Sequence, residues 1–200
     1  PPDRPGFATT VNCKGIGEDT VRWSFLNSKA IHFPENTDVS TSEFVANRLI
    51  VEDLDGDGEK DVLVSAKHNA FPCLILNLDA ATGVEINHYL HVGHLNDMKV
   101  WDLDGDGIKE VILCGTNNAF KNACLVVLDP RNLSGVSPTT GYYVPEGYTP
   151  AREKAYMRIP RTVLGILHQK QMLYNHAAWI GLEPEKRTLR VHVQDVYDVG

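Results

Sequence analysis

Short apolar runs rich in β-branched residues recur through the middle of the chain and predict buried strands. The clearest runs are residues 62–66 and 111–115, and each follows a similar run, at 48–52 or 98–101. Runs of this length, bounded by Gly, Asn, Asp or Pro, are typical of strands. Because β-branched residues fit the pleated surface of a sheet, we predict that the chain is all-β.

The predicted strands follow one another in the same order twice. Residues 44–94 predict strand, acidic loop, strand, turn, strand, turn, strand, and residues 95–144 repeat this order, with a looser fourth strand near 135–144. The tripeptide Asn-Ala-Phe occurs at 69–71 and again at 118–120, with the same offset of 49 residues. A four-stranded unit of this period is typical of a propeller blade. We therefore predict β-propeller-like blades of four antiparallel strands.

The N-terminal part of the chain is less regular. Residues 1–43 predict a lead-in and a partial blade. The lead-in, residues 1–20, contains Pro, Gly and polar residues with little periodicity. The partial blade is a hairpin in which residues 21–26 pair with residues 30–33.

Residues 145–200 predict one degenerate blade. Its last hairpin is clear, with strands at 177–182 and 188–193 around a turn at 183–186, whereas 163–178 fits either strands or a short helix. Propellers usually need four or more blades, and only two complete blades are predicted. We therefore expect a partial or small propeller, or self-association through open blade edges.

Two acidic segments interrupt the predicted strands and are nearly identical. Residues 53–61, the first acidic loop, read Asp-Leu-Asp-Gly-Asp-Gly-Glu-Lys-Asp. Residues 102–110, the second acidic loop, read Asp-Leu-Asp-Gly-Asp-Gly-Ile-Lys-Glu. Each loop places carboxylates at its positions 1, 3, 5 and 9, which are Asp53, Asp55, Asp57 and Asp61 in the first loop and Asp102, Asp104, Asp106 and Glu110 in the second. Acids this close repel one another unless a cation lies between them.

The residue types in these loops favour a calcium ion. Two glycines in each loop let the backbone turn tightly enough to direct the carboxylates at one centre. Oxygen-only ligands suit a hard cation of calcium size better than zinc or copper. The EF-hand loop opens similarly, but it needs a bidentate acid at position 12 and a helix on each side. Val64 and Leu113 hold position 12 here, and predicted strands flank both loops. The EF-hand is therefore excluded.

At these residues the chain resembles the FG-GAP/VCBS-type repeats of β-propellers, which occur in integrin α-subunits and many bacterial exported proteins. The shared pattern is D-x-D-G-D-G-x-x-D followed by a strand. The resemblance implies two calcium sites, with side-chain ligands at positions 1, 3, 5 and 9 and the main-chain carbonyls of Glu59 and Ile108 at position 7. Glu110 departs from the pattern, which has Asp. The integrin-like Phe-Gly and Gly-Ala-Pro words are absent, so the bacterial variety is the nearer relative.

The acidity of the chain is local to the two loops. The net charge is −7, and the eight loop carboxylates carry −8, so the rest of the chain sums to +1. Without a basic stripe, we expect no nucleic-acid partner. No apolar run is long enough to span a membrane. Because calcium loops are usually loaded outside the cytosol, we expect an extracellular or periplasmic location.

Cysteines and histidines offer further candidate sites. The four cysteines contain no Cys-x-x-Cys pair, and their spacing assigns no disulfide; they are Cys13, Cys73, Cys114 and Cys124. The last three lie in apolar runs and are predicted to be buried thiols. Three histidines are evenly spaced, at His88, His91 and His94. Because side chains alternate along a strand, exposed strand-edge histidines are favoured over a transition-metal site.

Aromatic residues suggest two possible binding rims. Phe71 and Phe120, in the repeated tripeptide, could line one rim or pack between blades, and the repetition favours packing. An aromatic loop with Tyr142, Tyr143 and Tyr148 could contact a sugar or peptide, or form a satellite core.

Two functional hypotheses follow. The first is a calcium-stabilised, non-catalytic propeller module that binds a protein, peptide or glycan in adhesion or sensing. The second is part of a propeller-type polysaccharide lyase or glycoside hydrolase. The chain has no G-x-S-x-G or H-E-x-x-H motif, and Glu52 and Asp97 remain without a visible partner for acid–base chemistry. The first hypothesis is therefore favoured.

Overall fold

The chain is all-β, as the sequence predicts. The computed structural model describes residues 9–27, 31–33, 44–68, 71–140, 144–163 and 172–197. Its strands are β1 (Thr10–Lys14), β2 (Val21–Leu26), β3 (Phe44–Glu52), β4 (Asp61–His68), β5 (Cys73–Asp79), β6 (Glu85–His91), β7 (Leu95–Trp101), β8 (Glu110–Asn117), β9 (Asn122–Leu128), β10 (Gly135–Ser137), β11 (Ala155–Ile159), β12 (Met172–Glu183) and β13 (Thr188–Tyr197). Two short 3-10 turns, η3 (Pro130–Asn132) and η4 (Pro184–Lys186), also occur. Within these ranges no helix has the length and apolar character to cross a membrane.

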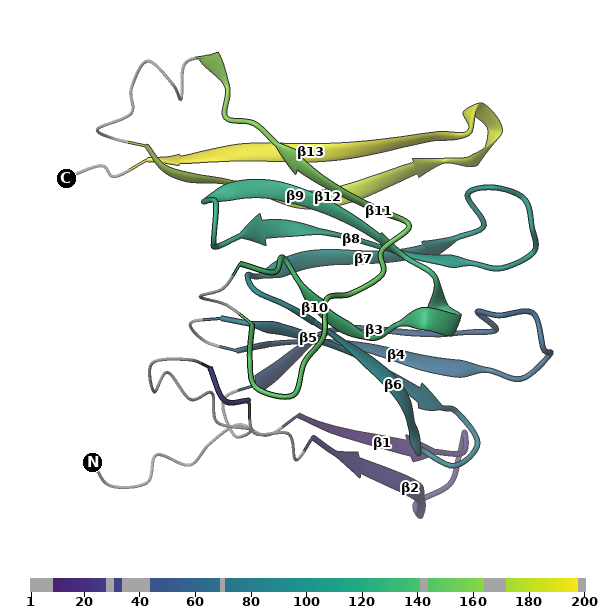
Figure 1. Ribbon diagram of the computed structural model, residues 1–200. Helices are drawn as coiled ribbons and strands as arrows, with labels where there is room; N and C mark the ends of the chain where they lie inside the picture. Colours follow the sequence, from purple (N-terminus) through teal and green to yellow (C-terminus); the bar gives the residue numbers. More distant parts are fainter. Residues whose placement is uncertain are drawn as a thin grey trace.

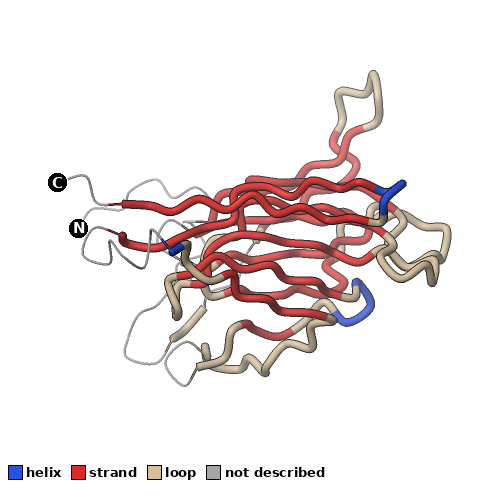
Figure 2. The backbone as a smooth tube through the Cα atoms, turned by 90° about the horizontal axis from the view of Figure 1, so that it is seen from above, coloured by secondary structure: helices blue, strands red, loops and turns tan. Residues whose placement is uncertain are grey.

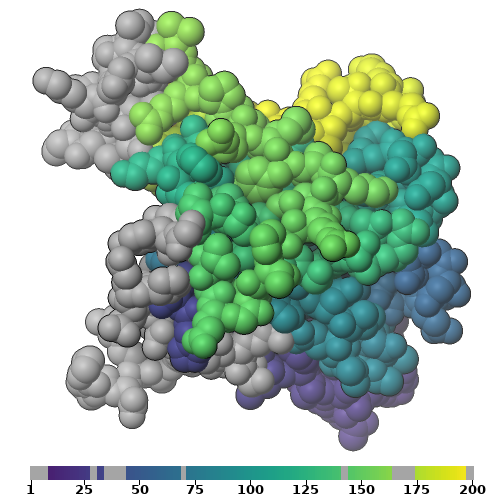
Figure 3. Space-filling view, viewed as in Figure 1, coloured from purple at the N-terminus to yellow at the C-terminus, as the bar shows by residue number. Residues whose placement is uncertain are grey.

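The sheets stack face to face, from the β1-β2 sheet at the bottom of Figure 1 to the β12-β13 hairpin at the top. In the described residues they have the strand orders β1-β2, β10-β6-β5-β4-β3, β11-β9-β8-β7 and β12-β13. We call them the first, second, third and fourth layers. Seen from above in Figure 2, the strands run roughly along one another and the loops gather at their ends. Apart from β10, which returns to the second layer, the chain builds one layer after another, and the colours of the space-filling view in Figure 3 follow this order from purple at the bottom to yellow at the top.

An apolar core fills the space between each pair of neighbouring layers. Val62 and Val64 belong to the core between the first and second layers, whereas Leu63 belongs to the core between the second and third. Likewise, Val111 faces the second layer and Ile112 faces the fourth. Because successive side chains on a strand point to opposite faces, both faces of these strands are buried. This explains why the central strands read as continuous apolar runs.

Three of the four cysteines are buried thiols, as predicted, and all four are free. Cys73 and Cys124 lie in the core between the second and third layers, and Cys114 lies in the core between the third and fourth. Cys13 is half-buried on β1.

The second predicted blade ends differently from the prediction. The fourth strand expected near 135–144 is wrong, because β10 pairs in parallel with β6 of the second layer. Instead β11, expected in the degenerate blade, pairs with β9 and completes the third layer. Contacts between residues far apart in the sequence explain why β10 joins the second layer and β11 takes the predicted place in the third. Val136 is buried in the core between the first two layers, and its backbone bonds to Thr149 and Ala151 at 2.9 and 3.0 Å.

Of the two hairpins predicted near the chain termini, the N-terminal one is wrong and the C-terminal one is confirmed. The hairpin expected between 21–26 and 30–33 is wrong, because β2 pairs with β1, which lies inside the expected irregular lead-in. Ile31 and Phe33 instead bury their side chains in the first core. The C-terminal hairpin is confirmed as β12 and β13. Of the ambiguous segment 163–178, residues 164–171 lie outside the described residues, and the chain is a strand from Met172 onward.

Candidate cation sites

Each acidic loop connects two antiparallel strands at one end of a layer. The first acidic loop links β3 to β4, where Glu52 pairs with Asp61. The second links β7 to β8, where Trp101 pairs with Glu110. The strands predicted on both sides of each loop are therefore confirmed, and the helices of an EF-hand do not flank them.

The two acidic loops lie side by side, at the right of Figure 1. The backbone N–H of Lys109 donates to the carbonyl of Leu54 at 2.8 Å, and the Lys109 ammonium lies 2.7 Å from Oε1 of Glu52. A Cβ placed on Gly56 would lie 3.7 Å from the carbonyl oxygen of Gly107. Two loops 49 residues apart in sequence thus form one acidic rim.

The first position of each loop organises its backbone. In the first loop, Oδ1 of Asp53 accepts from the N–H of Gly56 at 2.8 Å, and Oδ2 accepts from the N–H of Gly58 at 3.2 Å. Both glycines have positive φ, +79° and +91°, a region that other residues rarely adopt. The same two bonds form around Asp102 in the second loop, at 2.6 and 3.0 Å. The glycines therefore allow the tight coil that the sequence predicts.

The first three acids of each loop come together. They form two groups: Asp53, Asp55 and Asp57 in the first loop, and Asp102, Asp104 and Asp106 in the second. Within each group, one carboxylate oxygen of every residue lies within 4.8 Å of one from each of the other two. Oxygens that share one calcium ion at about 2.4 Å are at most about 4.8 Å apart. The donor set is also oxygen-only, which calcium prefers. These residues fit a calcium ion in both chemistry and spacing.

The ninth-position acids differ between the loops. Asp61 is half-buried, and its pKa is raised, first by burial and then by the negative charge of Asp55. Glu110 is fully buried, and its Oε2 accepts from the N–H of Leu103 at 2.8 Å. The proposed ligand roles of the main-chain carbonyls of Glu59 and Ile108 stay predictions.

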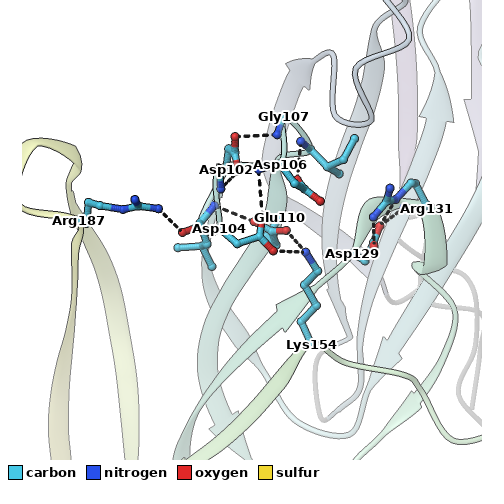
Figure 4. A network of polar contacts seen from close by, with 12 residues as sticks. Asp102, Asp104, Asp106, Gly107, Glu110, Asp129, Arg131, Lys154 and Arg187 are labelled. Carbon is cyan, nitrogen blue, oxygen red and sulfur yellow. Dashed lines mark hydrogen bonds and ion pairs between the residues drawn. The ribbon is translucent and has the colours of Figure 1, made fainter.

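A lysine from a distant segment enters the second acidic loop (Figure 4). The ammonium of Lys154, just before β11, donates to Oδ2 of Asp104 at 3.1 Å and to Oε1 of Glu110. The hydrogen bond to Glu110 is the main cause of the raised pKa of Lys154, and the hydrogen bond from Lys154 lowers the pKa of Asp104. The second loop thus contains a cation that belongs to the chain itself.

Sequence reasoning missed Lys154 because it is 44 residues from Glu110 and 50 from Asp104. The substitution of Glu for Asp at position 110 was the one local signal. The extra methylene of Glu lets the buried carboxylate bond to the N–H of Leu103 and to the lysine together.

Two arginines border the same loop in Figure 4. The guanidinium of Arg187, from the turn between β12 and β13, donates to the carbonyl of Leu103 at 3.2 Å. Arg131 makes a two-point ion pair with Asp129, at 2.9 and 2.6 Å. The second acidic loop is therefore enclosed by more positive charge than its sequence alone suggests.

The three histidines are not the exposed set that was expected. His91 is fully buried, where its Nε2 lies 2.9 Å from the Tyr156 hydroxyl and its Nδ1 lies 3.3 Å from the carbonyl oxygen of Gly93. His88 is partly buried and contacts Glu85 at 2.8 Å. His94 is partly buried as well. The exposed interpretation is wrong because each ring contacts a distant segment: His91 contacts Tyr156, His88 contacts Tyr148 and His94 contacts the carbonyl of His68.

The aromatic candidates divide between packing and exposure. Phe71 packs edge-on against Phe33, with centroids 5.3 Å apart, so packing between layers is confirmed for it. Phe120 is 42% exposed, with the Arg158 guanidinium 4.1 Å from its ring centre, so packing between layers is wrong for this residue. Tyr148 packs against the first core, as a satellite core requires. Tyr142 and Tyr143, with Asn69 and Ala70, lie outside the described residues.

The carboxylates that sequence reasoning left without partners are both held in ion pairs. Glu52 bonds to Lys109, and this contact lowers the pKa of Glu52. Asp97 is buried, accepts from the N–H of Ile180 at 2.9 Å and pairs with Arg48 at 3.3 Å. Both therefore join separate segments of the fold.

An open groove of about 610 Å³ lies beside β6 of the second layer. Its lining includes Glu85, Asn87 and His88 of β6 and, across from them, Glu146 and Tyr148. The Tyr148 hydroxyl lies 3.2 Å from Nε2 of His88, which ties the two walls together.

Comparison of the chain with protein-family models, with curated proteins and with solved structures finds no match.

Proposed function

We propose that the chain is a calcium-stabilised, propeller-type interaction module that acts outside the cytosol without catalysing a reaction. The observation that carries this proposal is the acidic rim, in which two equivalent loops each bring three carboxylates within 4.8 Å of one another. Mutual repulsion of these charges favours the uptake of a divalent cation. Calcium contributes folding free energy in this proposal, because it binds a site that only the folded loops create.

The arrangement of the layers supports a propeller-type architecture. The second and third layers each run from an edge strand, β3 or β7, through the next two strands to a fourth strand, β6 or β11. Neighbouring layers pack face to face, as propeller blades do. We propose that the described layers correspond to successive blades.

The groove beside β6 provides a binding surface for the proposed module. Its volume of about 610 Å³ lies in the range of ligand sites in proteins. Carboxylate, amide, imidazole and phenol groups line it, and these recognise the hydroxyls of a glycan or the backbone of a peptide. We propose a glycan or peptide as the ligand. Glu52 and Asp97 are engaged in ion pairs, so we develop this hypothesis in preference to a lyase or hydrolase.

Thermal unfolding with and without calcium tests the proposal. With calcium at about a hundredfold excess over the dissociation constant, each occupied site adds about 2.7 kcal/mol. For a chain of this length we expect the Tm to fall by roughly 5–10 °C for each occupied site that a chelator empties. Magnesium should restore less of the loss, because it requires stricter octahedral geometry.

A matched pair of variants provides the control. Replacing Asp55 and Asp57 by Asn disables the first acidic loop and should reduce the calcium-dependent gain in Tm. Replacing the exposed Asp19 and Glu185 by Asn and Gln makes the same change in charge and should leave the gain intact. A Tm that is the same in calcium and in chelator would contradict the proposal.

A further inference from the structure

The two acidic loops share their sequence pattern and backbone bonds but differ in the cation that reaches them. Lys154 lies 3.1 Å from Asp104 and also contacts Glu110, the third and ninth positions of the second loop. Among the described residues, no Lys or Arg nitrogen lies within 4.0 Å of the four equivalent acids of the first loop. The difference must come from the segments that pack around the loops.

Strand register identifies the position in the second layer that matches Lys154. Ala155 pairs with Val127, so Lys154 lies opposite Leu128, one step further along. In the third layer Val111 pairs with Leu128, and in the second layer Val62, the residue equivalent to Val111, pairs with Leu78. Leu78 is therefore the equivalent of Leu128, and it pairs with Glu85, which holds the place of Lys154 beside the first loop. The side chain of Glu85 is a carboxylate and supplies no cation.

We propose that Lys154 is a tethered cation that takes the place of calcium in the second acidic loop, so that the two loops bind calcium with unequal affinity. The inference rests on the proposed function, because it concerns access to the same sites. A calcium ion needs the carboxylate oxygens of positions 3 and 9 at about 2.3–2.6 Å. Those oxygens already bond to the Lys154 ammonium, so an ion enters only when this side chain moves out.

The burial of Glu110 strengthens this competition. Glu110 is fully buried. Removing the partner of a buried carboxylate costs more free energy than removing that of an exposed one, because water does not replace the lost hydrogen bonds. The ninth acid of the first loop, Asp61, is only half-buried. The first loop therefore fills at low calcium, while the second stays neutralised by the chain itself.

Calcium titration by calorimetry tests the role of Lys154 in a chain whose first loop is disabled by Asp55→Asn and Asp57→Asn. In that background we expect Lys154→Met to bind calcium at least about tenfold more tightly than the parent, the scale of one charged hydrogen bond. Lys67→Met is the matched control, because Lys67 bonds to the neutral Asn96 at 3.4 Å. It should leave the affinity unchanged. Equal affinities of the parent and the Lys154→Met variant would overturn the inference.

A reciprocal variant covers the case in which Lys154→Met does not fold. In a chain whose second loop is disabled by Asp104→Asn and Asp106→Asn, Glu85→Lys should weaken calcium binding at the first loop by about tenfold relative to Glu85→Met, the control that also removes the Glu85 carboxylate. Equal affinities of the Glu85→Lys and Glu85→Met variants would overturn the inference.

The same titrations separate the two proposals. A first loop that binds no calcium contradicts the proposed function and the inference together. Calcium binding of equal strength at both loops of the unaltered chain overturns only the role of Lys154.

Discussion

The buried side chain of His91 takes part in a hydrogen-bond network between the second and third layers. His91, on β6, contacts the hydroxyl of Tyr156 on β11 at 2.9 Å, and this hydroxyl also accepts from Asn117 on β8 at 2.8 Å. Tyr156 has one hydroxyl hydrogen, so it donates to Nε2 of His91 while accepting from Asn117. The remaining ring nitrogen, Nδ1, then carries the proton and donates to Gly93. The imidazole is thus held neutral.

Stability should fall as the pH falls below about 6.5, because His91 is buried in its neutral form. Burial lowers the pKa of His91 from 6.5 to about 4. Between these values the unfolded chain binds a proton that the folded chain does not, so the folded state loses stability as the pH decreases. The full effect is about 3 kcal/mol. Denaturant unfolding at a series of pH values measures it.

The variant His91→Gln isolates this contribution. Its stability should change less between pH 6.5 and 4 than that of the unaltered chain, although His94, whose pKa is also lowered by burial, retains part of the dependence. Parallel pH profiles for the two chains would show that His91 does not carry the effect.

Gly115 permits a close approach of two strands and should not tolerate a side chain. A Cβ at this position would lie 1.9 Å from the carbonyl oxygen of His94. Because backbone must move to relieve this overlap, Gly115→Ala should lower the free energy of unfolding by about 3 kcal/mol. Gly181→Ala is the control, since its Cβ would meet no backbone atom, only the ring of Trp179 at 3.0 Å and, at 3.8 Å, the Cβ of Arg190. Urea unfolding compares the two, and equal losses would contradict the expectation.

At the scale of elements, polar side chains join strands from different layers. Asp97 on β7 bonds to Arg48 on β3 of the second layer and to the N–H of Ile180 on β12 of the fourth. Asn175 on β12 accepts from the N–H of Ala123 on β9 at 2.8 Å. These bonds fix how the C-terminal hairpin lies on the third layer, which apolar packing alone does not specify.

Replacing Asp97 by Ala should therefore loosen three layers together. The change leaves the buried N–H of Ile180 without its acceptor and removes the partner of Arg48, for an expected loss of about 3 kcal/mol. Asp97→Asn keeps an acceptor oxygen and should lose about 1 kcal/mol. Chemical unfolding measures both. Equal effects of the two substitutions would indicate that the acceptor at this position is unimportant.

The elements also show how far sequence reasoning reaches. The strands around the acidic loops were predictable, because apolar side chains at 62–66 and 111–115 are buried on both faces and need no distant partner to be recognised. The positions of β10 and β11 were not, because such short segments carry no local signal for the sheet edge that they join. The contact of Lys154 with Glu110 was missed for the same reason, since it depends on where β11 lies.

At the scale of the whole molecule, β3 is an edge strand of the second layer among the residues that the structure describes. Three large apolar side chains on this strand, Val45, Leu49 and Val51, are 53%, 54% and 46% exposed. A long apolar edge strand offers unpaired backbone groups and apolar surface to another chain. We therefore predict that the self-association expected from the sequence would involve β3.

Leu49→Lys should reduce that self-association, because a charged side chain on an edge strand opposes pairing with another strand. We expect sedimentation velocity to show concentration-dependent association for the unaltered chain and less for the variant. Ile16→Lys, at a fully exposed position away from this edge, should leave association unchanged. Purely monomeric behaviour of the unaltered chain at every concentration would contradict the expectation.

The reactivity of the buried thiols reports on local unfolding of the layers. Burial raises the pKa of Cys114 and of Cys124 to about 12, so neither forms the reactive thiolate while its surroundings are closed. Cys114 becomes accessible when the C-terminal hairpin departs, whereas Cys124 responds to separation of the two central sheets. The order in which the two thiols are alkylated therefore shows whether the fourth layer separates from the third before the third separates from the second.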